Sequence, residues 1–244
     1  MAVRAETMGT ARSYSKLAPL YDELVGSRQF ALNCRNFEHW ASRRLRRLGR
    51  VADLACGTGL FAEYLGRRWR VPVLAVDRSP EMLAIARGRC RGLDVRFLCQ
   101  DVRALRLPSL VDLITLNSFT FNQLAQDLSS ILDSVARHLA SDALFLFDAL
   151  TPRHRLTTRS SSSATAIPRR KTPGTVCIDV SIHPRGEKPD REIHCAKLFE
   201  PRDVQQLLRR HGFALADMRD ALTLQPVHGT SPAVACLAFR QRER

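Results

Sequence analysis

Between residues 51 and 148 the chain alternates short apolar runs with stretches of helical periodicity. The apolar runs are Val51–Ala55, Val73–Asp77, Asp94–Leu98, Val111–Leu116 and Ala143–Asp148, and the helical stretches include Leu60–Arg67, Ser79–Arg89 and Leu124–Leu139. Near-continuous apolar strands followed by helices are typical of a parallel sheet that is covered on both faces. Right-handed crossovers then predict a doubly wound, Rossmann-like α/β fold.

The flanking segments predict additions to this sheet. Residues 1–48 are expected to form an N-terminal helical arm, in which Tyr14 and Tyr21, seven residues apart, share one helical face. Residues 151–174 have no periodicity and predict a mobile loop, and two alternating stretches around Pro184–Asp190 predict a β-hairpin. A helix from Pro201 to Gly212 and strands at Phe213–Arg219 and Ala233–Phe239 would complete a mostly parallel seven-stranded sheet.

No long linker interrupts the pattern, so we expect a single domain over residues 1–244. Its parts would be the arm (1–48), the core (49–150), the loop and hairpin cap inserted after the fifth strand (151–200), and the C-terminal part of the core (201–244).

Composition restricts the class of protein and leaves the partner open. No apolar run is long enough to span a membrane, and the first 16 residues lack an apolar stretch, so we expect no secretory signal. The seven cysteines are scattered without a CxxC pair, which predicts reduced thiols in a cytoplasmic protein and no metal site. The net charge of +14 rests on 34 Arg and 4 Lys spread along the chain. This distribution favours a solvated basic surface over a nucleic-acid site, which stays an alternative.

A turn of small residues joins the first strand to its helix and indicates a ligand site. Gly57 and Gly59 allow a ligand to lie against the main chain, and Asp53 ends the strand before them. Asp77 closes the second strand, 20 residues after Gly57, where its carboxylate can accept hydrogen bonds from a ribose diol. Dinucleotide-binding enzymes share this arrangement, but they need a third glycine that the "GTGLFA" turn lacks.

Four motifs in order then resemble the class I S-adenosylmethionine-dependent methyltransferases, small-molecule type. These are "DLACGTG" from Asp53, "AVDRSPEML" from Ala75, "VRFLCQDVRAL" from Val95 and "VDLITLNSFTFNQL" from Val111, and the similarity extends over roughly residues 12–150. The chain departs from the family pattern at Ala55, where glycine is common, and at "ASDA" from Ala140, where Pro-Gly-Gly is usual.

The resemblance implies S-adenosylmethionine as cofactor and assigns a role to each candidate residue. The main chain at Ala55, Gly57 and Gly59 would accommodate the methionine part, with Asp53 and Asn117 beside it, and Asp77 would hold the ribose. Arg78 and Met82 would flank the adenine, Asp101 and the N–H of Val102 would bind its edge, and Tyr14 and Tyr21 would cover the sulfonium.

Methyl transfer from a sulfonium requires alignment and exclusion of water more than it requires a catalytic group. A hydroxyl acceptor still needs a general base, and His154, which follows the fifth strand, is the candidate. The resemblance therefore implies methyl transfer to an N or O atom of a small molecule of specialised metabolism by a monomer or homodimer. A tRNA or rRNA methyltransferase and a cofactor-binding protein without methyl transfer remain the alternatives.

Overall fold

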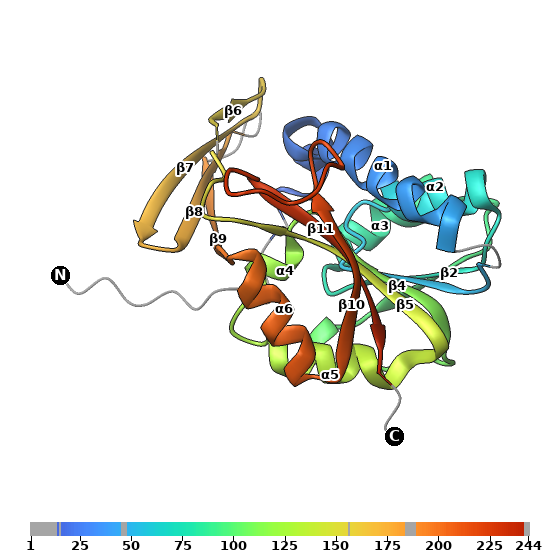
Figure 1. Ribbon diagram of the computed structural model, residues 1–244. Coiled ribbons are helices and arrows are strands. Elements are labelled where there is room, and N and C mark those ends of the chain that lie inside the picture. The colour runs from blue at the N-terminus through green and yellow to red at the C-terminus, as the bar shows by residue number, and fades with distance from the viewer. Residues whose placement is uncertain (1–13, 15, 45–47, 156, 184–188, 242–244) are drawn as a thin grey trace.

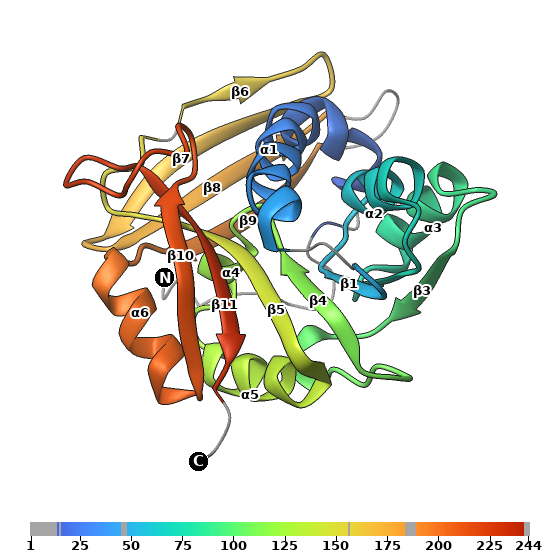
Figure 2. The same ribbon diagram turned by 45° about the vertical axis from the view of Figure 1, so that its right-hand side comes forward.

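The computed structural model describes residues 14, 16–44, 48–155, 157–183 and 189–241. Its central sheet has seven strands in the order β10-β11-β5-β4-β1-β2-β3, so the predicted doubly wound sheet is confirmed (Figures 1 and 2). The strands are β1 (Val51–Leu54), β2 (Val73–Asp77), β3 (Val95–Cys99), β4 (Val111–Leu116), β5 (Leu139–Leu150), β10 (Phe213–Asp220) and β11 (Ala233–Arg240). The first five pair in parallel, whereas β11 is antiparallel to both β5 and β10.

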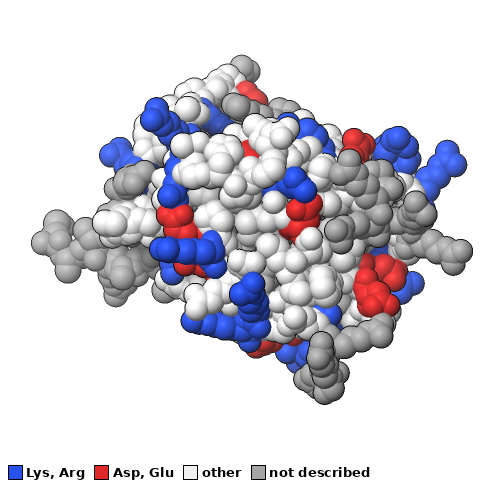
Figure 3. Space-filling model, in the orientation of Figure 1, with Lys and Arg blue, Asp and Glu red and all other residues white. Residues whose placement is uncertain are grey.

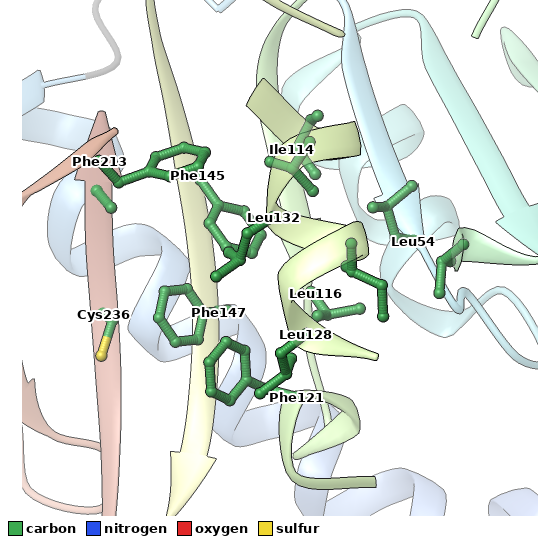
Figure 4. Packing of buried hydrophobic residues seen from close by; sticks show 14 of the residues in the cluster. Leu54, Ile114, Leu116, Phe121, Leu128, Leu132, Phe145, Phe147, Phe213 and Cys236 are labelled. Atoms are coloured by element: carbon green, nitrogen blue, oxygen red, sulfur yellow. The ribbon is translucent and has the colours of Figure 1, made fainter. Parts of the chain in front are cut away.

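Two layers of helices bury the faces of this sheet. The helices are α1 (Ser27–Arg44), α2 (Leu60–Tyr64), α3 (Pro80–Arg89), α4 (Thr120–Gln123), α5 (Leu128–His138) and α6 (Pro201–Arg210). On one face, Phe37 and Trp40 of α1 pack with Phe61 of α2. On the other face, α5 and α6 cover Phe145 and Phe147 of β5, as Figure 4 shows for α5. Each face therefore has its own apolar core, as the near-continuous apolar strands require.

Several local predictions are confirmed, and others need correction. Ser79 caps α3, because its hydroxyl accepts a hydrogen bond from the Met82 N–H, and Pro80 occupies the first turn. The helix predicted over Leu124–Leu139 begins later than expected, because residues 124–127 form turns and α5 starts at Leu128, and the predicted helix at Leu60–Arg67 is α2 followed by a π-helix, Leu65–Trp69. Strand β5 extends at both ends beyond the predicted Ala143–Asp148, because β11 pairs with it as far as Leu150.

The segment expected to be a mobile loop contributes two strands to a separate antiparallel sheet, which we call the cap sheet. It consists of β6 (Arg159–Ser160), β7 (Ala164–Thr172), β8 (Thr175–Ile182) and β9 (Asp190–Lys197), and it lies beside the start of α1 (Figure 2). The hairpin of β8 and β9 was predicted, although residues 184–188 of its turn lie outside the described residues. The loop prediction failed because the buried face of β7 consists of small side chains, Ala164 and Ala166, which pack against the arm, whereas its larger apolar residue, Ile167, is exposed.

The prediction of seven reduced cysteines is also wrong. Cys177 of β8 and Cys195 of β9 form a disulfide, and they stand directly opposite each other in the antiparallel pair. Their separation of 18 residues in sequence carried no indication of pairing, because the register of the hairpin decides which residues meet. The other five cysteines are free.

The arm places both tyrosines as expected, but by a different backbone conformation. Residues 1–13, 15 and 45–47 lie outside the described residues. Tyr14 has a φ of 71° and is therefore not helical, and short helical turns follow at Ala18–Leu20 and Asp22–Gly26. The rings of Tyr14 and Tyr21 nevertheless meet edge to face, with centroids 5.9 Å apart. Leu17 and Leu24 anchor this segment against the cap sheet.

Gly59 gives a direct test of how tightly α2 and α3 pack. Its φ is +80°, and an added Cβ would lie 2.8 Å from the Cβ of Ala86. We expect Gly59→Ala to lower the free energy of unfolding by about 2–4 kcal/mol, from the left-handed conformation and the overlap together. Gly92 has a similar φ of +79° and open space around it, so Gly92→Ala should cost only about 1–2 kcal/mol. Urea denaturation measures both, and equal losses would contradict the packing role of Gly59.

Candidate functional site

The carboxyl ends of the central strands bring four polar side chains to one edge of the sheet. Asp53 lies in β1, Asp77 ends β2, Asn117 follows β4 and Asp148 lies in β5. Strand β1 pairs with both β2 and β4, and β4 pairs with β5, so these positions are neighbours in space. Ligands of open α/β sheets bind at this edge.

A cavity of about 710 Å³, partly open to solvent, lies over β1 and β2. Nine of the twelve predicted cofactor-binding residues line it: Tyr14, Tyr21, Ala55, Gly57, Asp77, Arg78, Met82, Asp101 and Val102. The structure adds residues that the sequence did not indicate, among them Gln100, Ser118, Thr120 and Gln123. Gly59 does not line the cavity, because it faces α3.

Asp77 is held rigidly at the centre of this cavity. Its Oδ2 accepts a hydrogen bond from the Gly57 N–H and its Oδ1 accepts one from the Ser79 N–H, each at 2.9 Å. Burial raises the pKa of the carboxyl, and these two N–H donors oppose the rise. Since each carboxylate oxygen has two lone pairs, one on each oxygen stays available for a vicinal diol.

A second cavity, of about 440 Å³, continues from the first. Tyr21, Ala55, Gly57 and Ser118 line both, and the further lining of the second includes Gln29, Asn33, Asp53 and Asn117. Asp53 and Asn117, which flank the predicted methionine site, therefore lie in the second cavity, and Asp77, which is predicted to hold the ribose, lies in the first. The two cavities share a wall at the turn after β1, where Ala55 and Gly57 both have positive φ.

Two buried polar atoms in the second cavity have no hydrogen-bond partner among the described residues. Asp53 Oδ1 accepts from the Thr115 hydroxyl at 2.8 Å, but Asp53 Oδ2 accepts nothing, and Asn117 Nδ2 donates to nothing. Burial raises the pKa of Asp53 to about 7. Unpaired buried polar atoms are costly, so their natural complement is a ligand with one cationic donor and one anionic acceptor. An α-amino acid group has both, which fits the methionine part of S-adenosylmethionine.

Asp101 reaches the first cavity as an ionised side chain. The Arg103 side chain bonds both of its oxygens, and the Arg103 N–H donates to Oδ1 at 3.0 Å. The hydrogen bonds from Arg103 hold the pKa of Asp101 below its usual value. The adenine contact assigned to Asp101 and Val102 stays a prediction, and the Arg103 partner was not anticipated.

The cap sheet fixes Tyr14 over the first cavity. The Tyr14 N–H donates to Glu192 Oε2 at 2.8 Å, its hydroxyl donates to Gln123 Oε1 at 2.8 Å, and its ring stacks on His194 at 4.1 Å. Glu192 and His194 belong to β9. Gln123 and Glu192 were missed because only the tertiary fold brings residues 123 and 192 to residue 14.

Asp148 was also missed, and it shapes the loop after β4. Its carboxylate accepts hydrogen bonds from the N–H groups of Ser118 (3.2 Å) and Phe119 (2.5 Å), which both have positive φ. Burial raises the pKa of Asp148 to about 7. An acid at the end of the fifth strand, opposite the loop after the fourth, is the only indication that the sequence offered.

His154, the predicted base, does not line either cavity. Its ring lies 5.9 Å from that of Phe119, and its Nδ1 is buried without a hydrogen-bond partner among the described residues. Burial and the nearby Arg159 lower the pKa of His154, so the imidazole is neutral at physiological pH. Within the described part of the chain, no cluster of three His, Cys, Asp or Glu side chains could hold a metal ion, and no helix is long and apolar enough to cross a membrane.

Comparisons with known proteins agree with this geometry. A family model for a methyltransferase domain matches residues 51–142. The malonyl-[acyl-carrier protein] O-methyltransferase of Bacillus cereus is 30% identical over 191 residues, which is 78% of this chain and 66% of that protein. Other methyltransferases of that name are matched over 34–36% of their length, so the chain spans only part of these relatives.

Solved structures share the fold over almost the whole chain. An S-adenosylmethionine-dependent methyltransferase from Clostridium acetobutylicum has a TM-score of 0.77 at 23% identity, covering 94% of this chain and 99% of that one. The amino pentose methyltransferase CalS10 from Micromonospora echinaspora, solved with S-adenosylmethionine bound, has a TM-score of 0.65 at 17% identity and covers 98% of this chain and 100% of that one. The matched domain, the four sequence motifs and the shared fold together show that the chain belongs to the class I S-adenosylmethionine-dependent methyltransferases.

Proposed function

We propose that this protein transfers a methyl group from S-adenosylmethionine to an N or O atom of a small molecule. The observation that carries the proposal is the pair of joined cavities, which match the two polar ends of that cofactor. The first presents a buried carboxylate, Asp77, for the ribose, and the second presents an unpaired acceptor, Asp53 Oδ2, and an unpaired donor, Asn117 Nδ2, for the amino acid.

The bound cofactor supplies an electrophilic methyl group on a sulfonium. The protein aligns the reacting atoms and excludes water from them. The residues shared by both cavities mark where the sulfonium would lie, because they stand between Asp77 and Asp53. Tyr21 is one of them, and an aromatic face favours a cation over water. Tyr14 covers the first cavity and is held there by Gln123 and Glu192, which favours exclusion of water from the reacting atoms.

The cap sheet supports a small acceptor. It packs on the arm through Ala164, Ala166, Val180 and Ile182, and the arm contributes Tyr14 and Tyr21 to the lining of the first cavity. Among the similar proteins, CalS10 acts on an amino pentose and the Bacillus cereus relative on a malonyl group carried by a protein. Both names support methyl transfer to a small group. The second name specifies oxygen as the methylated atom, and neither name specifies nitrogen.

The nucleic-acid alternative rests on the charge of +14. On the face seen in Figure 3, basic side chains lie in separate groups, several beside acidic ones, and form no continuous stripe. A tRNA or rRNA substrate would produce binding that weakens steeply with salt, because each neutralised phosphate releases counterions. A flat response between low and moderate salt would exclude that alternative.

Transfer of label from [methyl-³H]S-adenosylmethionine to a panel of amines, amino sugars, alcohols and carboxylates tests the proposed function. We expect S-adenosylhomocysteine and one labelled class of acceptor to form together. Because His154 lines neither cavity, His154→Gln should change kcat by less than about twofold for hydroxyl and amine acceptors alike, and a loss of about 10²-fold confined to hydroxyl acceptors would restore it as the base. Cofactor binding without labelled product from any class would favour a non-methylating function instead.

The pKa of Asp53 predicts how cofactor binding depends on pH. An ammonium group beside Asp53 favours the carboxylate over the neutral acid, whose pKa in the free protein is about 7. The affinity for S-adenosylhomocysteine should therefore rise with pH, by up to about tenfold per unit below pH 7, and level off above it. Calorimetry from about pH 5.5 to 7.5 measures this dependence.

The pKa of Asp148 is also about 7, so Asp148 would titrate over the same range of pH. Asp53→Asn is therefore the matched control, because it removes only the Asp53 titration. The amide should bind S-adenosylhomocysteine more weakly and with little dependence on pH. An equal slope in both proteins would mean that a different group titrates and that Asp53 does not hold the amino group.

A further inference from the structure

An arginine of the cap sheet donates to the arm and has no carboxylate partner among the described residues. Arg159 of β6 is partly buried, and its Nη1 donates to the carbonyl of Leu24 at 3.2 Å. Within the described ranges, no Asp or Glu oxygen lies within 4 Å of its guanidinium. Three other arginines of the same region, Arg153, Arg169 and Arg191, each form an ion pair with Asp or Glu.

The contacts of Arg159 lead to Tyr21 through the arm, although Arg159 itself lines neither cavity. In the β6–β7 pair Arg159 stands opposite Ala166, and Ala166 belongs to the same buried cluster as Leu24, against which Tyr21 packs. The hydroxyl of Tyr21 makes no hydrogen bond with any described residue, and its ring lines both cavities. The guanidinium is therefore bonded to Leu24, three residues after Tyr21 in the arm, and both it and the Tyr21 O–H lack an anionic partner among the described residues.

The electrostatics agree with this placement. Arg159 acts on two groups at once, since it lowers the pKa of His154 and opposes the rise in the pKa of Tyr21. Burial is the main cause of that rise, which takes the pKa of Tyr21 to about 12. Tyr21 is therefore a hydrogen-bond donor at physiological pH, and an arginine is always charged. Both groups are therefore donors. An anionic group on the acceptor molecule would pair with them better than a neutral or cationic group would.

We propose that Arg159 and the Tyr21 hydroxyl bind an oxyanion, a carboxylate or a phosphate, on the methyl acceptor. The proposal rests on the proposed function and narrows its substrate to anionic small molecules. A partly buried guanidinium with one carbonyl partner gains most from a charged acceptor, because charge-assisted hydrogen bonds are about twice as strong as neutral ones. The position beside Tyr21 holds that oxyanion near the place where the sulfonium would lie.

Calorimetry on the protein saturated with S-adenosylhomocysteine tests this proposal without requiring turnover. The carboxylate probe is the malonyl thioester of N-acetylcysteamine, compared with the corresponding thioester in which the free carboxylate is a carboxamide. The phosphate probe is glucosamine 6-phosphate, compared with glucosamine. We expect one charged probe to bind at least about tenfold more tightly than its neutral partner, the scale of a hydrogen bond to a charged group.

Three variants locate the effect. Arg159→Gln and Tyr21→Phe, which keeps the ring, should each weaken binding of the charged probe by about tenfold or more and leave the neutral probe unchanged. Arg169→Gln removes the same charge from an exposed position of the cap sheet and should change binding by less than about twofold.

Three results would overturn the proposal while S-adenosylhomocysteine still binds. They are no preference for either charged probe, unchanged binding by Arg159→Gln, and an equal loss in Arg169→Gln, which would indicate the general field of the basic surface. Failure of S-adenosylhomocysteine to bind at all would contradict the proposed function itself.

Discussion

The hydrogen bond from the Gly57 N–H to Asp77 Oδ2 joins the turn after β1 to the end of β2, and the site depends on it. The bond fixes a buried carboxylate at the place where the main chain of the turn is most open. Positive φ at Ala55 and Gly57 curls the turn so that the N–H groups of Cys56 and Gly57 donate to Val76 and Asp77 of β2. Parallel pairing of β1 with β2 makes this contact possible between residues 20 apart in sequence.

A second constraint, far from the first in sequence, closes the cavity. Glu192 accepts hydrogen bonds from the backbone N–H groups of Tyr14, Lys16 and Leu17 at 2.8, 3.2 and 3.3 Å. One carboxylate of the cap sheet thus satisfies three donors of an irregular segment that has no regular helix to satisfy them. The arm keeps its conformation because the cap sheet supplies those acceptors, and Tyr14 reaches the cavity as a result.

The sequence predicted the central fold well because its signals are local. Apolar strands, the Ser79 cap and the acid that ends β2 all lie within a few residues of the structure they indicate. Eleven of the twelve predicted binding residues line one of the two cavities, although their contacts with the cofactor stay predictions. Gly59 is the exception. A glycine after a strand can either leave room for a ligand or allow close packing of helices, and the sequence pattern does not distinguish the two.

The features that the sequence could not predict are made by distant segments. The buried face of strand β7 has only small side chains, so its sequence does not indicate a strand. It forms because it pairs with β8 and packs against the arm. The Cys177–Cys195 pair follows from the register of a hairpin, and the support of Tyr14 follows from β9. Tyr14 and Tyr21 meet, but the expected helix is absent. The proximity of the two rings was therefore predicted correctly, but from a helical backbone conformation that Tyr14 does not have.

A crystal structure of the protein with S-adenosylhomocysteine tests the central claim most directly. The ribose hydroxyls should lie within hydrogen-bond distance of Asp77, and the α-amino group should lie within the same distance of Asp53 Oδ2, near the Asn117 amide. Electron density for the nucleoside elsewhere, or an amino acid group pointing away from the second cavity, would contradict the account.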